Sequence, residues 1–211
     1  MTMYTSVQQG ALDLIHARTS VAHFDSQVEM SDDTVTALIG HSCQAPSSYN
    51  LQNWRFIAVK TTERKAALRE VAYGQPQVAD ASVTFIVIGT LDGQDRIRST
   101  MQAFHQAGYL DAEGLDAWVS DTQRSMNGKP VKQRDEAIRS ASLAAMTLMH
   151  AAQAMGWVSA PLGGFDADAL SIAFGLAPTE VPVMLVAVGQ SGPDNWPRKM
   201  RRPVEEVLAI V

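Results

Sequence analysis

Four separated segments of the sequence carry residue types that could bind an anion and a flat cofactor. Residues 18–20 (Arg-Thr-Ser) place a cation and two hydroxyl groups at the end of a helical pattern, which suits a phosphate. Residues 45–56 form a polar loop, dense in amides, that runs directly into an aromatic strand pattern. Residues 161–166 place two adjacent glycines before a helix N-cap, where glycine lets a ligand approach the backbone. Residues 198–202 hold four of the chain's 17 lysines and arginines.

Taken singly, each segment also has an ordinary structural explanation: a helix end, a turn, a loop, or a solvated basic face. The polar loop is the hardest to explain in this way, because a turn accounts for its Pro-Ser-Ser but not for the amides before Trp54. Together the four segments indicate a binding site assembled from distant parts of the chain.

Several common catalytic signatures are missing. The sequence has no G-x-G-x-x-G after a strand, no G-x-x-x-x-G-K-[ST], no G-x-S-x-G and no H-E-x-x-H. The histidines share no metal-ligand spacing with Cys43, so we predict no metal site. Cys43 is the only cysteine, cannot form an internal disulfide, and is expected to be a small buried residue at a helix end.

Composition narrows the class of protein. The chain has 211 residues, and 17 basic against 22 acidic side chains give 17 − 22 = −5. Hydrophobic residues make up 46% and charged residues 18%, which is ordinary globular usage and favours one domain over 1–211. An acidic chain does not suit general nucleic-acid binding. Apolar runs such as 85–88 are too short to span a membrane, and the N-terminus lacks signal-peptide features, so we expect a cytoplasmic protein.

Hydrophobic periodicity predicts a helix-rich α+β domain around a small sheet. The most buried strand is expected at 83–89, where a nearly continuous apolar run indicates burial on both faces. Alanine, leucine and methionine on nearly every face predict a buried helix over 136–155. The other predicted elements are a surface helix at 7–18, a helix capped by Ser31 that ends near Pro46, a strand at 55–60, a helix after Thr62, helical pieces within 92–132 capped by Asp111, a short helix from Asp166 to Gly175, and a strand at 183–189 with Pro182 at its first residue or an edge.

In order and spacing, the segments resemble the FMN-dependent nitroreductase family over essentially the whole chain. Residues 18–21 are similar to its N-terminal Arg-x-Ser motif, and residues 45–56 to its Pro-Ser-Ser-x-Asn-x-Gln-x-Trp-x-Phe segment, the most specific of the matches. Residues 74–78 are similar to the family's glutamine-containing lead into the central strand. Residues 161–166 resemble its Pro-x-x-Gly-Phe-Asp loop, and residues 199–201 its C-terminal Lys-x-Arg phosphate clamp.

The resemblance implies a small mixed or antiparallel central sheet surrounded by helices, in an intertwined homodimer. Two FMN molecules would lie in the subunit interface, each contacted by both chains. Cations and hydroxyls of the terminal segments would hold the phosphate, the polar loop would come from the neighbouring subunit, and the glycines would present backbone N–H groups toward flavin N5. The implied cofactor-binding residues are Arg18, Thr19, Ser20, Pro46, Ser47, Ser48, Asn50, Gln77, Pro161, Leu162, Gly163, Gly164, Lys199 and Arg201. No catalytic side chain is expected, because the hydride step belongs to the flavin.

The implied activity is ping-pong transfer from NAD(P)H through FMN to a small-molecule acceptor such as a nitroaromatic or quinone. Two departures favour an alternative, a flavin-binding carrier or sensor with little turnover. Ala22 stands where family members often carry Arg or Lys, and Gln77 where some have Lys, so less positive charge would stabilise the reduced flavin. A third possibility, ranked well behind, is an all-helical interaction module that docks a partner through residues 136–155. Candidates to cover the flavin are Phe104 and Trp118.

Overall fold

The computed structural model describes residues 5–211; residues 1–4, which the predicted domain includes, lie outside the described part. The elements in chain order are α1 (Ser6–Ala17), α2 (Asp32–Ser42), η1 (Ser48–Asn50), β1 (Trp54–Val59), α3 (Thr62–Val71), α4 (Pro76–Asp80), β2 (Val83–Thr90), α5 (Gly93–Gln106), α6 (Ala112–Met126), α7 (Pro130–Ala154), β3 (Val158–Leu162), α8 (Ala167–Phe174), β4 (Glu180–Gly189) and η2 (Val204–Glu206).

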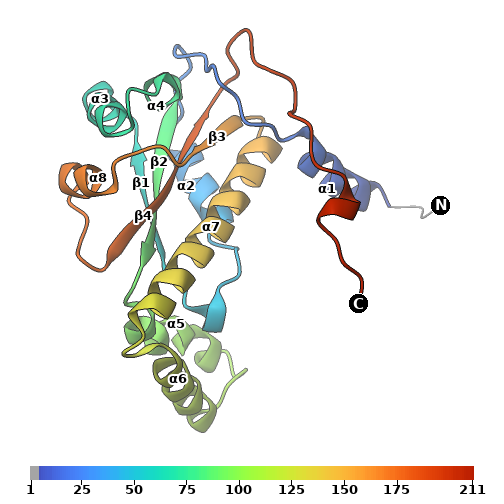
Figure 1. Cartoon of the computed structure of the whole chain (residues 1–211). Coiled ribbons are helices and arrows are strands. Elements are labelled where there is room, and N and C mark those ends of the chain that lie inside the picture. The colour runs from blue at the N-terminus through green and yellow to red at the C-terminus, as the bar shows by residue number, and fades with distance from the viewer. Residues whose placement is uncertain (1–4) are drawn as a thin grey trace.

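The sheet is antiparallel throughout, with strand order β1-β2-β4-β3. All eight residues of β2 are buried, which confirms the predicted central strand. Figure 1 shows α7 and α2 on one face of the sheet and α3, α4 and α8 on the other. Because side chains alternate along a strand, Phe85 packs toward α7 beside Leu148, whereas Ile86 packs toward Leu68 of α3.

The predicted helix signals are confirmed in detail. The side chain of Ser31 accepts a hydrogen bond from the Thr34 N–H, and that of Asp111 accepts one from the Gly114 N–H. Asp166 caps α8 in the same way, and Gly175 ends that helix in the left-handed conformation at φ 64°. Local sequence therefore fixes these helix ends.

Some boundaries differ from the prediction. The short strand β3 and the one-turn helix α4 were not predicted, and α7 begins at Pro130 rather than residue 136. Strand β4 begins at Glu180, so Pro182 is its third residue. Pro182 pairs with Ile88 next to a register shift, in a part of β4 that β3 does not reach, so its missing N–H breaks no bond to β3.

The prediction that Cys43 is buried is wrong. The thiol is exposed, and the preceding residue, Ser42, takes the buried position instead. The Ser42 hydroxyl donates a 2.8 Å hydrogen bond to the carbonyl of Ala144, so this end of α2 is held against α7 by a polar contact.

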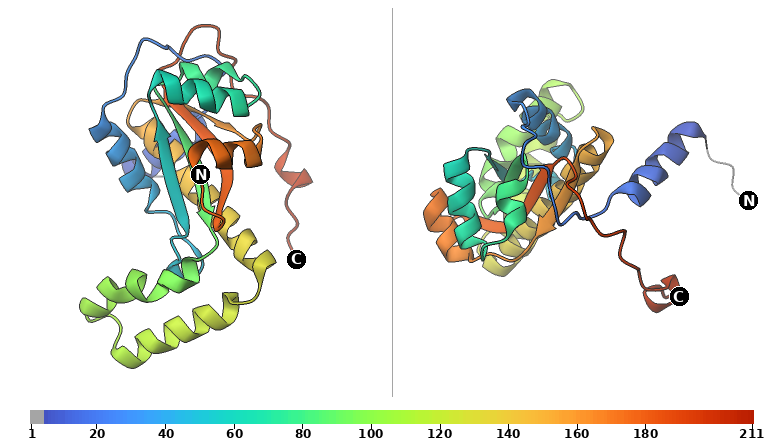
Figure 2. Two further views of the ribbon diagram at one scale, coloured as in Figure 1. Left: turned by 90° about the vertical axis from the view of Figure 1, so that its left-hand side faces the viewer. Right: turned by 90° about the horizontal axis from the view of Figure 1, so that it is seen from above.

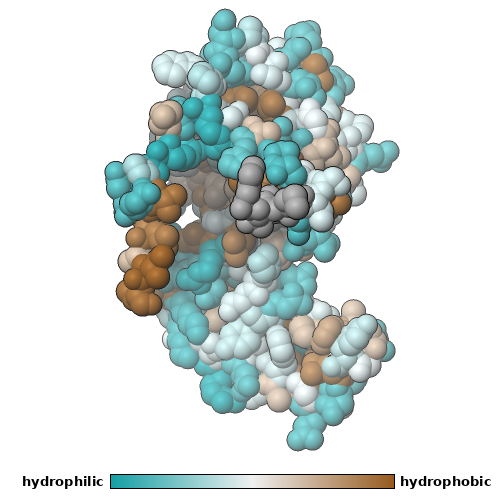
Figure 3. Space-filling view, turned by 90° about the vertical axis from the view of Figure 1, so that its right-hand side faces the viewer, coloured by the Kyte–Doolittle hydropathy of each residue, from teal (hydrophilic) through white to brown (hydrophobic). Residues whose placement is uncertain are grey.

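Three parts of the structure extend away from the sheet. Figure 2 shows α1 and the C-terminal segment reaching out on one side, and α5 with α6 projecting as a separate helical pair. No residue of α1, over Ser6–Ala17, is buried. Apolar side chains gather along the outside of the C-terminal segment, as Figure 3 shows. Within residues 5–211, none of the helices combines the length and apolar character needed to cross a membrane.

Candidate functional site

The segment after α1 is held in place from two sides. The Val21 N–H donates to the carbonyl of Ser159 on β3 at 3.3 Å, and Ser20 forms a parallel bridge with the same residue. On the other side, Phe24 forms an antiparallel bridge with Ser191, just past β4. The sheet edge therefore fixes the backbone that carries Arg18 and Ser20.

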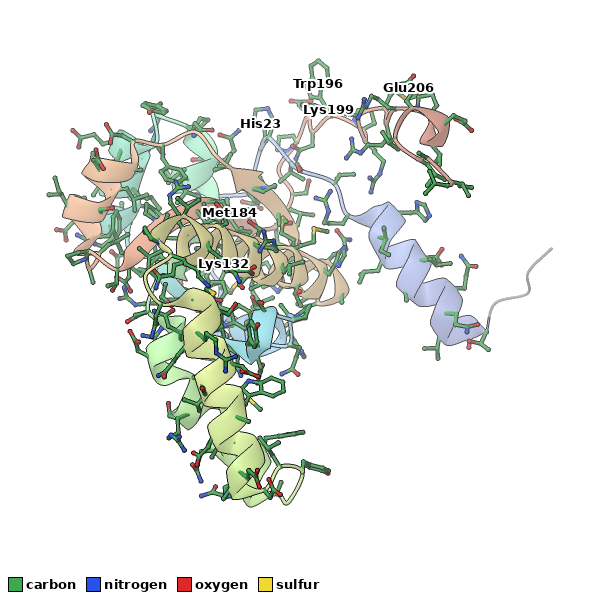
Figure 4. The ribbon with its side chains drawn as sticks, turned by 60° about the horizontal axis from the view of Figure 1, so that its bottom comes forward. His23, Lys132, Met184, Trp196, Lys199 and Glu206 are labelled. Atoms are coloured by element: carbon green, nitrogen blue, oxygen red, sulfur yellow. The ribbon has the colours of Figure 1, made fainter. Side chains whose placement is uncertain are left out.

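This segment and the C-terminal segment meet at a small cationic pocket of about 130 Å³. Figure 4 shows Trp196 and Lys199 of the C-terminal segment beside the stretch that carries His23, whereas Lys132 lies at a different end of the molecule. The lining residues are Thr19, Ser20, Trp196, Pro197, Arg198, Lys199 and Arg201. Residues about 180 positions apart in the sequence thus build one concave surface.

Arg18 stands beside this pocket with an incomplete set of partners. Its Nη1 is buried and has no hydrogen-bond partner within the described residues. Burial lowers the pKa of the Arg18 guanidinium below its ordinary value, and the charges of Arg198 and Arg201 lower that pKa further. A buried donor among like charges costs free energy, which an anion bound there would recover.

The predicted loop residues line a different pocket. Pro46, Ser47 and Ser48 face Ser140 and neighbouring side chains of α7 around a cavity of about 330 Å³. This pocket and the cationic one share no lining residue. One copy of the chain does not bring the two sets of predicted contacts together.

The loop has a strained backbone that several contacts determine. Tyr49, Asn50 and Gln52 all have positive φ, at 54°, 58° and 45°. The Ser47 hydroxyl accepts a 2.9 Å hydrogen bond from the Gln52 N–H. The indole Nε1 of Trp118, on α6, donates to the Tyr49 carbonyl at 3.1 Å.

Helix α5 holds the same loop from a second direction. The Asn50 side-chain amide donates to Sδ of Met101 at 3.6 Å, and Leu51 is buried in the cluster that α5 and α6 form. Gly93 is required at the start of α5, because a Cβ there would lie 2.8 Å from Cβ of Asn53. The projecting helical pair and the loop are therefore one packed unit.

The remaining predicted contacts lie beside the sheet. Gln77 on α4 has a buried Oε1 that lacks a hydrogen-bond partner in the described chain. Gly163 has open space where a Cβ would point, so a ligand can approach its backbone. Pro161 and Leu162 belong to β3, so the loop predicted over 161–166 begins only at Gly163.

The sequence did not indicate the contacts that four further residues make, although Trp118 was named as a candidate to cover the flavin. Arg198 and Asn195 tie the two terminal segments together, Trp118 holds the polar loop, and the Gln75 side chain donates to the Gly164 carbonyl at 2.6 Å. Arg198 lay inside the basic run, so its charge was visible but its role was not. The other three act on backbone atoms far away in sequence, for which no local signal exists.

Comparison with known proteins gives consistent results. The model of the nitroreductase family matches residues 15–190. YodC of Bacillus subtilis, which carries the name of an NAD(P)H nitroreductase, is 32% identical over 180 residues, covering 85% of this chain and 89% of YodC. The CLA biosynthesis enone reductase of Lactiplantibacillus plantarum is 29% identical over 189 residues, covering 88% of this chain and 87% of its own. A solved structure from Exiguobacterium sibiricum, described as a nitroreductase in complex with FMN, has a TM-score of 0.89 and 27% identity, covering 100% of this chain and 99% of that one.

The fold and the cationic pocket define an α+β protein that can hold an anionic group between its terminal segments. The chain belongs to the nitroreductase family, as the match over most of its length shows. The resemblance drawn from the sequence motifs and the α+β fold class are therefore confirmed, and membership places the chain among oxidoreductases.

Proposed function

We propose that the chain is an FMN-dependent NAD(P)H oxidoreductase that reduces nitroaromatics, quinones or related acceptors in two alternating half-reactions. The observation that carries this proposal is the buried Nη1 of Arg18, which has no partner in the described part of the chain and lies beside a pocket walled by Ser20, Lys199 and Arg201. A phosphate monoester carries nearly two negative charges and several acceptor oxygens, so it matches this excess of donors.

The other orphaned groups also fit a flavin nucleotide. The buried Gln77 Oε1 is an acceptor, and it suits a ribityl hydroxyl or a pyrimidine N–H. Gly163 leaves the backbone open to a flat ring, and Gln75 fixes the neighbouring Gly164. When bound, FMN supplies hydride acceptance from NAD(P)H and hydride delivery to the acceptor. The protein supplies position, charge and exclusion of water.

A second copy of the chain completes the site in this proposal. Helix α1 has no buried residue, and the C-terminal segment exposes Val204, Val207, Leu208 and Ile210 (Figure 3). On α7, Leu143 is 42% exposed although the helix was expected to be buried on nearly every face. Extended apolar arms of this kind indicate a partner surface.

The homodimer also explains why the predicted contacts fall into two pockets. Pro46, Ser47, Ser48 and Asn50 would reach the flavin of the neighbouring subunit, while the terminal segments of that subunit hold its phosphate. Dimer formation is then a condition for cofactor binding rather than an addition to it.

For the electron acceptor, we propose only a chemical class. The stacked pair Phe104 and Tyr109, with ring centroids 5.0 Å apart, lies on the projecting helical pair that would approach the partner's flavin. Aromatic side chains there suit flat acceptors such as nitroaromatics and quinones. The name of the enone reductase relative adds conjugated carbonyl compounds to the acceptors worth testing.

The purified protein provides the test. We expect a yellow protein whose flavin absorption near 450 nm is lost on anaerobic addition of NADPH or NADH and returns on addition of a quinone, roughly one flavin per chain. Steady-state rates should show parallel ping-pong lines. A protein that stays colourless after incubation with FMN contradicts the proposal, and bound FMN that neither nicotinamide bleaches favours a carrier or sensor.

A further inference from the structure

We propose that Asn195 and Arg198 are positioning residues that build the phosphate pocket by docking the C-terminal segment onto the segment after α1. The inference rests on the proposed function, because the pocket they shape is the one assigned to the FMN phosphate. It assigns to these two side chains a role distinct from that of Arg18, Lys199 and Arg201, which face the anion.

The Arg198 guanidinium donates its hydrogen bonds to backbone carbonyls at the end of α1. Its Nη2 donates to the carbonyls of Ile15 at 2.9 Å, His16 at 2.8 Å and Arg18 at 2.5 Å. Carbonyls in the last turn of a helix have no partners within the helix and carry the negative end of its dipole. Arg198 therefore acts as the C-terminal cap of α1 from more than 180 residues away.

The Asn195 side chain joins the same two segments a few residues earlier. Its Oδ1 accepts hydrogen bonds from the N–H groups of Ala22 at 2.7 Å and His23 at 2.9 Å. Its Nδ2 donates to the His23 carbonyl at 2.7 Å and to the Gly192 carbonyl at 3.1 Å. One amide thus extends the contact between the two segments beyond their short backbone pairing, which consists of the Phe24–Ser191 bridge and the Gly192 N–H bond to the His23 carbonyl.

These bonds decide where the anion-facing cations lie. Residues 192–203 contain no helix or strand, so local structure does not place Lys199 or Arg201. Arg201 adds only a 3.0 Å bond from Nη1 to the Lys199 carbonyl, within its own segment. Without Asn195 and Arg198, ordering this segment would be a cost of binding phosphate, whereas with them the ordering precedes binding.

The docking also holds the Arg18 backbone while leaving its side chain available. Arg198 binds the Arg18 carbonyl, and the Arg18 Nη1 keeps no partner in the described residues. Arg198 and Arg201 lie close enough to lower the Arg18 pKa, so the cations of this pocket repel one another. An anion relieves that repulsion, which makes binding selective for the charged end of a ligand.

The test compares affinity for FMN and for riboflavin, which lacks the phosphate, in flavin-stripped full-length protein. Asn195→Ala changes no charge and lies outside the pocket lining, so we expect FMN affinity to fall about tenfold while riboflavin affinity stays within twofold. Arg198→Lys keeps the charge, but the lysine ammonium lies one bond closer to the backbone than Nη2, the single atom that makes all three bonds, so it should give the same pattern. Asn127→Ala is the matched control, at an exposed position in the turn between α6 and α7, and it should change neither affinity.

The outcomes separate the two proposals. If Asn195→Ala and Arg198→Lys leave the FMN-to-riboflavin ratio at the wild-type value, the positioning role is overturned, whether both affinities are unchanged or fall together. Thermal unfolding of each variant identifies a general loss of folding. If Asn195→Ala proves unstable, Arg198→Lys, which keeps the positive charge, still tests the positioning role. A wild-type protein that binds neither flavin overturns the proposed function itself.

Discussion

The cationic pocket and the polar loop, which we propose to contact the same cofactor, differ in how their backbones are held and in which groups remain for a ligand. In the pocket, the backbone is held by side chains from the other end of the chain, and a charged donor of Arg18 has no partner among residues 5–211. In the loop, residues 47–52 are strained at three positions, but internal hydrogen bonds and Trp118 hold the backbone. The pocket therefore contains a buried hydrogen-bond donor that has no acceptor among residues 5–211, and the loop contains a strained backbone.

This difference predicts how strongly each region should respond to the charge of a ligand. An unpartnered buried cation gains most from an anion, so the pocket should discriminate by charge. Residues 47–52 carry no charged side chain and are held by hydrogen bonds, so the loop gains little from charge and contributes shape. Phosphate-bearing and phosphate-free flavins should therefore separate the two regions experimentally.

The largest expected effect is in the pocket. Arg18→Ala removes the buried donor, so FMN affinity should fall roughly 100-fold, about 3 kcal/mol, with riboflavin affinity nearly unchanged. Because Arg18 is desolvated beside two other cations, the flavin-free variant should unfold at the same or a higher temperature than wild type. Flavin fluorescence titration and thermal unfolding measure both quantities.

Arg202→Ala is the matched control for this change. Arg202 belongs to the same basic run, but it neither lines the pocket nor is one of the charges that lower the Arg18 pKa, so removing it should alter FMN affinity by less than about threefold. Equal losses in the two variants would mean that general positive charge, rather than the geometry of the pocket, attracts the nucleotide.

A smaller effect is expected in the loop. Trp118→Phe keeps an aromatic ring but removes the N–H that bonds the Tyr49 carbonyl, a loss of roughly 0.5–1.5 kcal/mol in holding the loop. FMN and riboflavin affinities should both fall a few-fold, and their ratio should stay constant. A change in the ratio would break the distinction between the two regions.

The smallest effect concerns pH. His150 on α7 has a buried Nε2 without a partner in the described residues, and burial together with the Arg18 charge lowers its pKa. The unfolded histidine titrates near 6.5, so between that value and the lower folded pKa the unfolded chain binds more protons. Stability of the flavin-free protein should therefore be complete above pH 6.5 and fall as the pH drops below it.

His150→Gln tests this directly. Denaturant unfolding at pH 7.5 and 5.5 should show a smaller loss of stability in the variant than in wild type. Bound FMN should also reduce the loss in wild type, because its phosphate offsets the Arg18 charge. Identical pH dependence in the variant and wild type would assign the acid sensitivity to other groups.

Much of the fold could be predicted because its signals are local. The continuous apolar run of β2 and the caps at Ser31, Asp111 and Asp166 each act within a few residues. Strand β3 was missed because five residues that include Pro161 carry no clear alternation and gain their place from pairing with β4. Tertiary pairing decides such segments.

The site divides in the same way. Motif spacing located the segments that carry Arg18, Ser20, Lys199 and Arg201, and the structure brings those segments to one place. Asn195 was not found, and Trp118 was named only as a candidate to cover the flavin, because each bonds to backbone atoms of a segment tens of residues or more away. A lone side chain bonding to distant backbone leaves no period, charge run or motif in the sequence.

The most direct test of the account uses mixed dimers, because its central claim is that the two regions meet only between subunits. Arg18→Ala chains and Ser48→Trp chains, carrying different tags, are co-expressed and the mixed dimer is isolated. If the pocket of one subunit and the loop of the other share a flavin, the mixed dimer keeps one intact site. It should then bind about one FMN, while both parental variants bind almost none. A mixed dimer as empty as its parents would contradict the claim.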